Sequence, residues 1–246
     1  MTGAGVAASG FGLPDIGLVT ATEMAERARM LVGVLGDVPL IADADTGYGE
    51  PMNVVRTVRL YEQAGVAAIQ LEDQVFPKRC GHLADKHVVD AAMFEQTLAA
   101  ALDTRDDDDL LVVARTDARA PLGLEAAIER ANRYARAGAD VIFVEAPRTV
   151  EEMALVAREI SAPKLINIVA GGLTPQIEPA ALRDLGYAIA IYPTTVLLAA
   201  TNAAIGALRG IAAPDAAPGP VGTMEDFFRL VGLDEWFAVS ERWDAR

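Results

Sequence analysis

The 246-residue sequence contains one cysteine, Cys80, and no run of basic residues longer than Lys78-Arg79. A single cysteine excludes an internal disulfide and fits a reducing compartment. Acidic residues number 35 and basic residues 21, so the net charge is −14 and a nucleic-acid backbone would be repelled. We therefore expect a cytoplasmic protein that does not bind nucleic acid.

Signals for targeting, membrane insertion and nucleotide binding are also missing. Residues 1–13 lack a basic segment followed by an apolar run, and the most apolar stretch, 187–208, is interrupted by Pro193, so we expect neither a targeting signal nor a membrane span. No G-x-G-x-x-G or Walker A sequence opens a helix candidate. This excludes the usual dinucleotide and nucleotide sites of an open sheet.

Six short apolar runs alternate with segments of helical periodicity, which is typical of βα units rather than hairpins. The helix candidates 51–64 and 124–137 are followed by or end near Gly65 and Gly138, and glycine commonly ends helices. Several runs are apolar at successive positions, as expected for a parallel sheet covered on both faces. The sequence predicts a barrel or a doubly wound sheet in one domain, with strands at 39–45, 67–73, 110–116, 141–146, 164–169 and 188–193.

Polar side chains stand at the carboxyl-terminal ends of five successive predicted strands. In a closed barrel these ends converge on one face, where active sites lie. The alternative is that the acidic residues only cap the following helices. Capping explains any single position as well as a functional site does, but it does not explain polar ends on five successive strands. The residues are Asp43 and Asp45, Glu72 and Asp73, Arg115 and Asp117, Glu145, and Asn167.

Three of these carboxylates form a candidate metal site. Asp43 and Asp45 are two positions apart and point to the same side of a strand, while Glu72 ends the next strand. Carboxylates gathered without adjacent Lys or Arg repel one another unless a cation is bound. Oxygen ligands without histidine favour Mg²⁺, which would act as a Lewis acid on a substrate oxygen.

The segment directly after the Glu72 strand combines Lys78, Arg79, Cys80 and His82 with a glycine. A lone cysteine is more often a small buried hydrophobic residue than a catalyst. Neighbouring cations stabilise a thiolate, however, and a loop position gives the thiol access to a substrate. Cys80 is therefore the candidate for acid–base chemistry.

Six stretches of the sequence resemble signature segments of the isocitrate lyase and phosphoenolpyruvate mutase superfamily. The most specific is K-R-C-G-H at 78–82, and the others follow the family order over nearly the whole chain, at 43–49, 69–74, 114–118, 143–146 and 191–193. The resemblance is strongest to 2-methylisocitrate lyases and 2,3-dimethylmalate lyases. It extends to oxaloacetate-acting members and to carboxyphosphonoenolpyruvate phosphonomutases.

The resemblance implies a (β/α)₈ TIM-type barrel that lacks its first βα unit here, in a single domain over 1–246 with a helical extension at about 222–246. It implies Mg²⁺ held partly through water by Asp43, Asp45 and Glu72. Cys80 is implied as the general acid, with Lys78, Arg79 and His82 assisting. The expected substrate-binding residues are Thr2, Gly3, Ala4, Arg115, Glu145, Asn167, Thr174 and Pro193.

Lyases of this superfamily cleave a carbon–carbon bond of a 2-hydroxy acid, and the cysteine protonates the resulting carbanion. By resemblance, the substrate is a 2-methylisocitrate-like or alkylmalate-like acid, and the products are pyruvate or glyoxylate and a dicarboxylate. Segment 74–87 corresponds to the family's gating loop. The family also implies a homo-oligomer, a dimer or tetramer, in which the aromatic-rich end at 227–243 docks on a neighbouring subunit; this end can equally fold back on its own barrel.

Two departures from the family pattern bear on the activity. The sequence begins about one βα unit later than family members do, so a tyrosine they carry two positions before the Thr2–Gly5 segment lies outside it. Many of the lyases also carry glutamate where Ala170 stands, which argues against methylisocitrate itself as the substrate. Four functions remain open: a carbon–carbon lyase, an oxaloacetate decarboxylase or hydrolase, a phosphonomutase, and an inactive barrel that serves as a scaffold.

Overall fold

The computed structural model describes residues 1–81, 85–213 and 223–244, and the chain divides into two units, Met1–Leu197 and Leu198–Arg246. The first unit carries a six-stranded sheet. All six runs predicted from the sequence form strands, each one shorter than the apolar run that contains it. The strands are β1 (Ile41–Asp43), β2 (Ala68–Glu72), β3 (Leu111–Thr116), β4 (Val141–Val144), β5 (Lys164–Asn167) and β6 (Ile189–Ile191).

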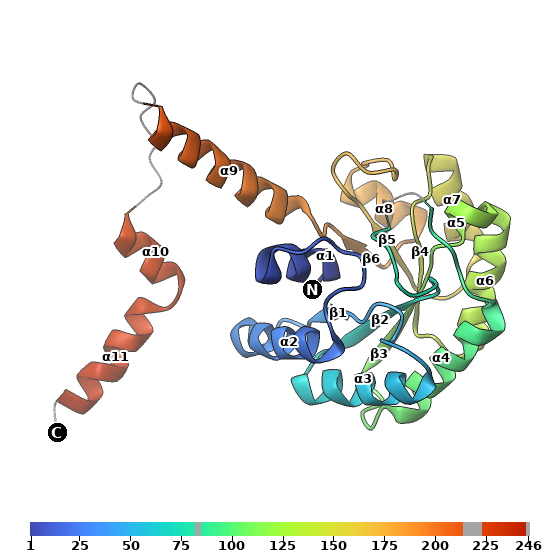
Figure 1. Ribbon diagram of the computed structural model, residues 1–246, viewed down its shortest axis with the longest axis horizontal. Helices are drawn as coiled ribbons and strands as arrows, with labels where there is room; N and C mark the ends of the chain where they lie inside the picture. The colour runs from blue at the N-terminus through green and yellow to red at the C-terminus, as the bar shows by residue number, and fades with distance from the viewer. Residues whose placement is uncertain (82–84, 214–222, 245–246) are drawn as a thin grey trace. The chain divides into compact units, whose positions relative to one another are not determined.

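The sheet is parallel throughout and runs in chain order from β1 to β6. It curls into part of a barrel, with the helices on its outer side (Figure 1). Beside β1, the Met1 amino group donates to the Ile41 carbonyl at 2.6 Å, and the Asp43 amide donates to the Met1 carbonyl at 3.1 Å. The predicted α/β barrel class is thereby confirmed, and the sheet is a six-stranded, curled half-barrel.

The helices of this unit begin and end at residues that favour such boundaries. Thr20 and Glu23 form a capping box at the start of α2, a proline occupies the first turn of α3, and Gly65 ends α3 with a φ of 83°. The helical elements are α1 (Gly3–Val6), a π-helix (Ala7–Phe11), α2 (Ala21–Leu35), α3 (Pro51–Ala64), α4 (Ala91–Thr104), α5 (Arg119–Leu122), α6 (Leu124–Arg136), α7 (Val150–Glu159) and α8 (Pro179–Leu185).

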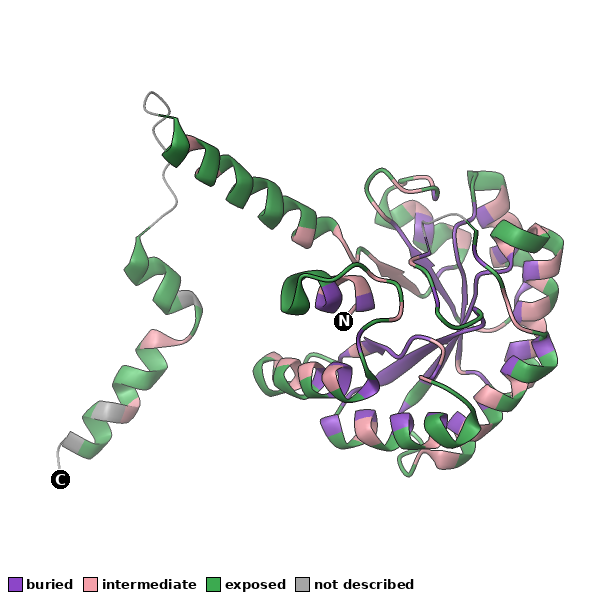
Figure 2. Cartoon of the chain, viewed as in Figure 1, coloured by how far each residue is buried: buried purple, intermediate pink, exposed green. Residues whose placement is uncertain are grey.

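Alternate strand residues belong to two separate apolar layers, because successive side chains of a strand point to opposite faces. On β3, Val112 and Ala114 pack between the sheet and the helices, whereas Val113 packs inside the curl with Phe143 and Leu165. Strands β2, β4 and β5 are buried, β6 is half-buried, and the helices expose their outer faces (Figure 2). The inner layer forms the floor on which the polar strand ends stand.

The second unit consists of helices with little buried surface. It contains most of α9 (Thr195–Ala212), then α10 (Met224–Leu230) and α11 (Leu233–Asp244). No described residue of α9 is buried, and the exposed aromatic side chains of α10 and α11 are Phe227, Phe228, Trp236, Phe237 and Trp243. By length and composition alone, α9 is the one described helix that could cross a membrane. These criteria do not distinguish a span from a helix that packs on another chain.

Candidate active site

A cavity of about 440 Å³ lies inside the curled sheet and reaches the carboxyl-terminal ends of its strands. It brings together ten of the residues selected from the sequence, which come from the N-terminal segment, five strands or strand ends, and the loop after β2. These residues are Thr2, Ala4, Asp43, Glu72, Lys78, Arg79, Cys80, Arg115, Asn167 and Pro193. The convergence follows from the parallel sheet, in which all carboxyl-terminal strand ends meet on one side.

Three carboxylates meet around Gly3 at the β1 side of the cavity. A Cβ atom on Gly3 would lie 3.0 Å from Asp43 Oδ2 and 3.4 Å from both Asp15 Oδ1 and Asp45 Oδ1. The Gly3 amide donates to Asp43 Oδ2 at 2.9 Å, and the Asp45 amide donates to Asp43 Oδ1 at 3.1 Å. Because a side chain at position 3 would crowd these oxygens, glycine gives the carboxylates room to converge.

Lys78 is the buried cation of this cluster. Its ammonium lies 2.8 Å from Asp45 Oδ1 and also binds Asp15. Burial by itself lowers the pKa of Lys78, but Asp43, Asp45, Glu72 and Asp15 together raise it above its ordinary value. The lysine is therefore charged, as a positioned partner for anionic groups.

The carboxylates nevertheless outnumber the cations that compensate them. Burial, reinforced by Asp43, raises the pKa of Asp45 to about 7 even though Lys78 opposes the shift. Burial also raises the pKa of Glu72 well above its ordinary value, against the effect of Arg115. The folded chain thus holds carboxylates in a place where their negative charge is unfavourable unless a further cation is present.

The donor set fits a hard cation. Glu72 Oε1 is buried and accepts no hydrogen bond from any described residue, and Asp43, Asp45 and Glu72 offer oxygen ligands of the kind that Mg²⁺ prefers. Within the described ranges, no three acidic, histidine or cysteine side chains close on a single point as a complete ligand set.

Arg115 occupies the centre of the opposite side of the cavity. Its guanidinium donates to Asp117 through Nε at 2.8 Å and through Nη2 at 3.0 Å, and it lies 3.3 Å from Glu72 and 3.7 Å from Glu145. The guanidinium carbon stands 5.2 Å from the ring centre of Phe143. Burial lowers the pKa of Arg115, but these carboxylates raise it well above its ordinary value. Arg115 is a fixed cation with a planar face toward the cavity.

Asn167 and Glu145 extend this polar side. Asn167 Nδ2 lies 3.4 Å and 3.5 Å from the two Glu145 oxygens. Asn167 Oδ1 is buried and has no hydrogen-bond donor among the described residues. Together with Arg115, the amide forms a polar wall suited to a carboxylate or hydroxyl group of a ligand.

Cys80 reaches the cavity from the loop after β2. The side-chain amide of Gln74 forms two hydrogen bonds with the Arg79 backbone, at 2.8 and 2.9 Å, and the Cys80 amide donates to the Asp15 carbonyl at 3.2 Å. Cys80 is partly exposed and lines the cavity. The loop therefore brings Cys80 to the cavity that Lys78 and Arg115 also line, while His82 lies outside the described residues.

The remaining predicted residues occupy different positions. Gly3 contributes its amide to Asp43, and Glu145 reaches the cavity residues through Arg115 and Asn167. Thr174 is buried but does not line the cavity. The backbone turns after β5, where the Gly172 amide donates to the Val169 carbonyl at 2.9 Å, and the structure does not bring Thr174 to the site.

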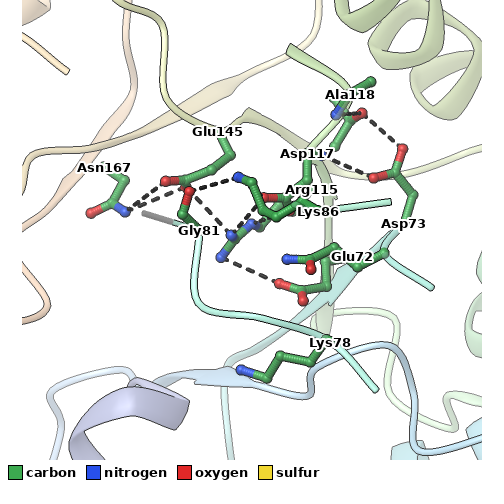
Figure 3. A network of polar contacts seen from close by, with 12 residues as sticks. Glu72, Asp73, Lys78, Gly81, Lys86, Arg115, Asp117, Ala118, Glu145 and Asn167 are labelled. Carbon is green, nitrogen blue, oxygen red and sulfur yellow. Dashed lines mark hydrogen bonds and ion pairs between the residues drawn. The ribbon is translucent and has the colours of Figure 1, made fainter. Parts of the chain in front are cut away.

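Three further polar residues belong to the site although they were not selected from the sequence. Gln70 lines the cavity and stands two positions before Glu72, so strand alternation alone would have placed it there. Asp15 binds Lys78, and Lys86 binds Asp117 (Figure 3). Both lie in irregular segments, where no periodicity indicates which way a side chain points.

A parallel half-barrel with an acidic cluster, a buried arginine and a loop thiol in one cavity defines an enzyme site of the TIM-barrel class. The family described as phosphoenolpyruvate phosphomutase matches residues 1–212. A 2,3-dimethylmalate lyase from Eubacterium barkeri is 47% identical over 238 residues, which cover 96% of this chain and 82% of the relative. A chloroplastic carboxyvinyl-carboxyphosphonate phosphorylmutase from Arabidopsis thaliana is 39% identical, with 99% and 74% covered.

Solved structures agree with these relatives. A crystal structure of 2,3-dimethylmalate lyase superposes with a TM-score of 0.93 at 39% identity, covering 98% of this chain and 82% of that one. Oxaloacetate acetylhydrolase in complex with 3,3-difluorooxalacetate gives a TM-score of 0.94 at 35% identity, with 99% and 84% covered. The chain belongs to the PEP mutase/isocitrate lyase superfamily and is an enzyme of that superfamily.

Proposed function

We propose that the chain is a Mg²⁺-dependent carbon–carbon lyase that cleaves an alkylmalate-like or 2-methylisocitrate-like 2-hydroxy acid to a 2-oxo acid and a second carboxylate product. The observation that carries this proposal is the place of Cys80. Its thiol lines the same cavity as the uncompensated carboxylates and the Arg115–Asn167 wall. Cleavage next to a hydroxy acid leaves a carbanion, and a thiol is a suitable proton donor for it.

In this proposal, Asp43, Asp45 and Glu72 would hold Mg²⁺, partly through water, and the bound ion would act as a Lewis acid on the substrate oxygens. Arg115 and Asn167 bind a substrate carboxylate. The substrate hydroxyl loses its proton to water and its oxygen becomes the carbonyl oxygen of the 2-oxo acid, while the electron pair of the breaking carbon–carbon bond passes to the carbon of the leaving carboxylic acid. Cys80 Sγ donates a proton to that carbon, while Lys78 and Arg79 surround the thiol with positive charge.

The distal end of the cavity favours a small, partly apolar substrate. Val169 and Ile191 line it with aliphatic groups, and Ala170 is exposed and brings no carboxylate. Among the relatives, 2,3-dimethylmalate lyase is named for an alkylated malate, and a 2-methylisocitrate lyase from Aeropyrum pernix is 46% identical over 211 residues. An alkylmalate fits this lining better than a tricarboxylate does.

An oxaloacetate-cleaving activity is the second candidate. It rests on the likeness to the inhibitor complex of oxaloacetate acetylhydrolase and uses the same cavity with a smaller substrate. A phosphonomutase activity rests on the plant relative and on the likeness to a solved phosphoenolpyruvate phosphomutase. The lyase reaction needs a thiol to protonate a carbanion more directly than either of these reactions does.

We also propose that the chain forms a homo-oligomer in the cytoplasm, and the exposed helices support the oligomer. Val196, Leu208 and Ile211 of α9 are 66–79% exposed, and the aromatic side chains of α10 and α11 are also exposed. Apolar faces of this kind commonly pack against a second copy of the chain. Light scattering after gel filtration would show a dimer or tetramer; a monomer would refute this part of the proposal.

The decisive experiment is an assay for 2-oxo acid release with Mg²⁺ from 2,3-dimethylmalate, 2-methylisocitrate, isocitrate and oxaloacetate. We expect release from an alkylmalate, a loss of about 10²- to 10⁴-fold in Cys80→Ser, and unchanged Mg²⁺ binding in that variant. Cleavage of oxaloacetate alone would favour the second candidate. A Cys80→Ser enzyme with the wild-type rate would refute the role of the thiol.

A further inference from the structure

Lys86 is a buried lysine with no role in the reaction proposed above. Its ammonium donates to Asp117 Oδ1 and to the Gly81 carbonyl oxygen, both at 2.6 Å. The side chains of Lys86 and Asp117 are 2% and 0% exposed. Lys86 thus joins the loop after β2 to the end of β3 in the middle of the polar network (Figure 3).

Asp117 is shared between Lys86 and Arg115. Burial by itself raises the pKa of Asp117, but Arg115 and Lys86 lower it below its ordinary value, so the carboxylate is charged. Arg115 also faces Glu72 and Glu145. With Lys86, two cations face these three carboxylates; without it, Arg115 alone would face all three, and an anionic substrate would meet a more negative site.

The second bond of Lys86 fixes the backbone next to the thiol. Gly81 lies so close to the opposite wall that a Cβ atom there would stand 2.4 Å from Arg115 Nη2 and 2.6 Å from Glu145 Oε1. The Gly81 carbonyl accepts from Lys86. The close approach of Gly81 to Arg115 is therefore held by a bond that Lys86 makes.

We propose that Lys86 is a positioning residue, which holds the Cys80–Gly81 backbone against Arg115 and offsets the charge of Asp117. The thiol and the carboxylate-binding guanidinium then face the same substrate. The catalytic consequence rests on the proposed function, whereas the placement of the loop does not depend on the substrate. Such placement matters because catalytic groups must be held close to their productive geometry.

The chain offers a matched control for this lysine. Lys164 is also buried and donates to two carbonyl groups, of Ile160 at 2.9 Å and Ala162 at 3.2 Å, but it stands at the amino-terminal end of β5. Lys86→Met and Lys164→Met therefore remove equivalent donors from opposite ends of the strands. Lys86→Arg keeps the charge, and a double variant of Lys86→Met with Asp117→Asn removes both charges in case the single variant does not fold.

Hydrogen exchange of the full-length chain without substrate tests the placement. The loss of a buried bond from a charged donor should speed exchange of residues 75–81 by about tenfold or more in Lys86→Met and in the double variant. Lys86→Arg should stay near the wild type, and Lys164→Met should leave this segment unchanged. Wild-type exchange in both Lys86→Met and the double variant would overturn the proposal.

Steady-state kinetics then tests the catalytic consequence. On a substrate identified by the assay above, Lys86→Met should raise KM and lower kcat/KM about tenfold or more, Lys86→Arg should recover most of this loss, and Lys164→Met should change only the unfolding midpoint. An unchanged KM in Lys86→Met would refute the electrostatic role. If the wild type cleaves nothing in the panel, the proposed function fails, while the exchange experiment still decides the placement.

Discussion

Two kinds of buried carboxylate stand side by side at the strand ends of this barrel. They differ in how completely neighbouring hydrogen-bond donors and cations compensate their charge. Asp73 is fully buried and accepts hydrogen bonds from Thr116, Asp117 N, Tyr134 and Arg130, at 2.8–3.2 Å. Glu72 is buried almost as deeply, yet its Oε1 accepts no hydrogen bond from a described residue, and the buried Asp45 has one ion pair, to Lys78 at 2.8 Å, against the charge of Asp43.

This difference distinguishes a carboxylate that holds the fold together from one that is available to a ligand. A fully bonded carboxylate ties β2, β3 and α6 together and leaves nothing for a ligand. An incompletely compensated carboxylate lowers the stability of the folded chain by itself and gains only when a cation or substrate binds. In this barrel the two kinds are adjacent in the sequence, at Asp73 and Glu72, because alternate positions of a strand end face different layers.

The largest effect on stability is expected when the fully hydrogen-bonded carboxylate, Asp73, is removed. Asp73→Ala leaves the Thr116 and Tyr134 hydroxyls and the Arg130 guanidinium without their shared acceptor, and should lower the free energy of unfolding by about 3–5 kcal/mol. Asp73→Asn, which keeps an oxygen acceptor, should lose less. Urea denaturation of the three proteins measures this, and equal losses for Ala and Asn would show that the acceptor is not what matters.

Replacing the incompletely compensated Asp45 should leave the stability of the fold intact and weaken metal binding instead. Asp45→Asn removes a charge that burial disfavours, so the metal-free chain should be no less stable than the wild type. The variant should weaken Mg²⁺ binding by about 10- to 100-fold, measured as the Mg²⁺ concentration that produces half of the thermal stabilisation. Normal Mg²⁺ binding in Asp45→Asn would remove this residue from the metal site.

A dependence on pH follows from the same carboxylate. The pKa of Asp45 rises from 3.8 to about 7 in the folded chain, so between these values the unfolded chain has lost this proton and the folded chain retains it. Its contribution to stability is therefore present below about pH 4 and is lost as the pH rises to about 7. In chelator-treated samples, the unfolding free energy of the wild type minus that of Asp45→Asn should fall over this range, and a difference that rises would contradict the assignment.

The smallest effect is expected for an ion pair that lies nearer the solvent. Arg119 binds Glu152 through two bonds, at 2.9 and 2.5 Å, in the geometry that Arg115 has with Asp117, but the two side chains are 15% and 19% exposed. Arg119→Gln should cost less than about 1 kcal/mol, because solvent screens this pair and can hydrate the group left behind. A loss as large as that of Asp73→Ala would show that burial does not set the difference.

Most of the fold could be predicted from the sequence, because strands and helices follow from local hydrophobic patterns. The six strands and the helices at 51–64 and 124–136 are where those patterns place them. The convergence of Asp43, Glu72, Arg115 and Asn167 also follows, since a parallel sheet gathers its carboxyl-terminal ends on one side. The position of Thr174 could not be predicted, because it depends on the path of an irregular loop.

The sequence by itself determined which carboxylates, cations and thiol stand at the strand ends and in the loop after β2, since those positions are fixed by local pattern and chain order. Only the tertiary structure decided which of these charged groups form ion pairs with one another. Lys86 meets Asp117 across 31 residues and Lys78 meets Asp15 across 63. Such pairings are set by how loops pack over the barrel, and no local periodicity records them.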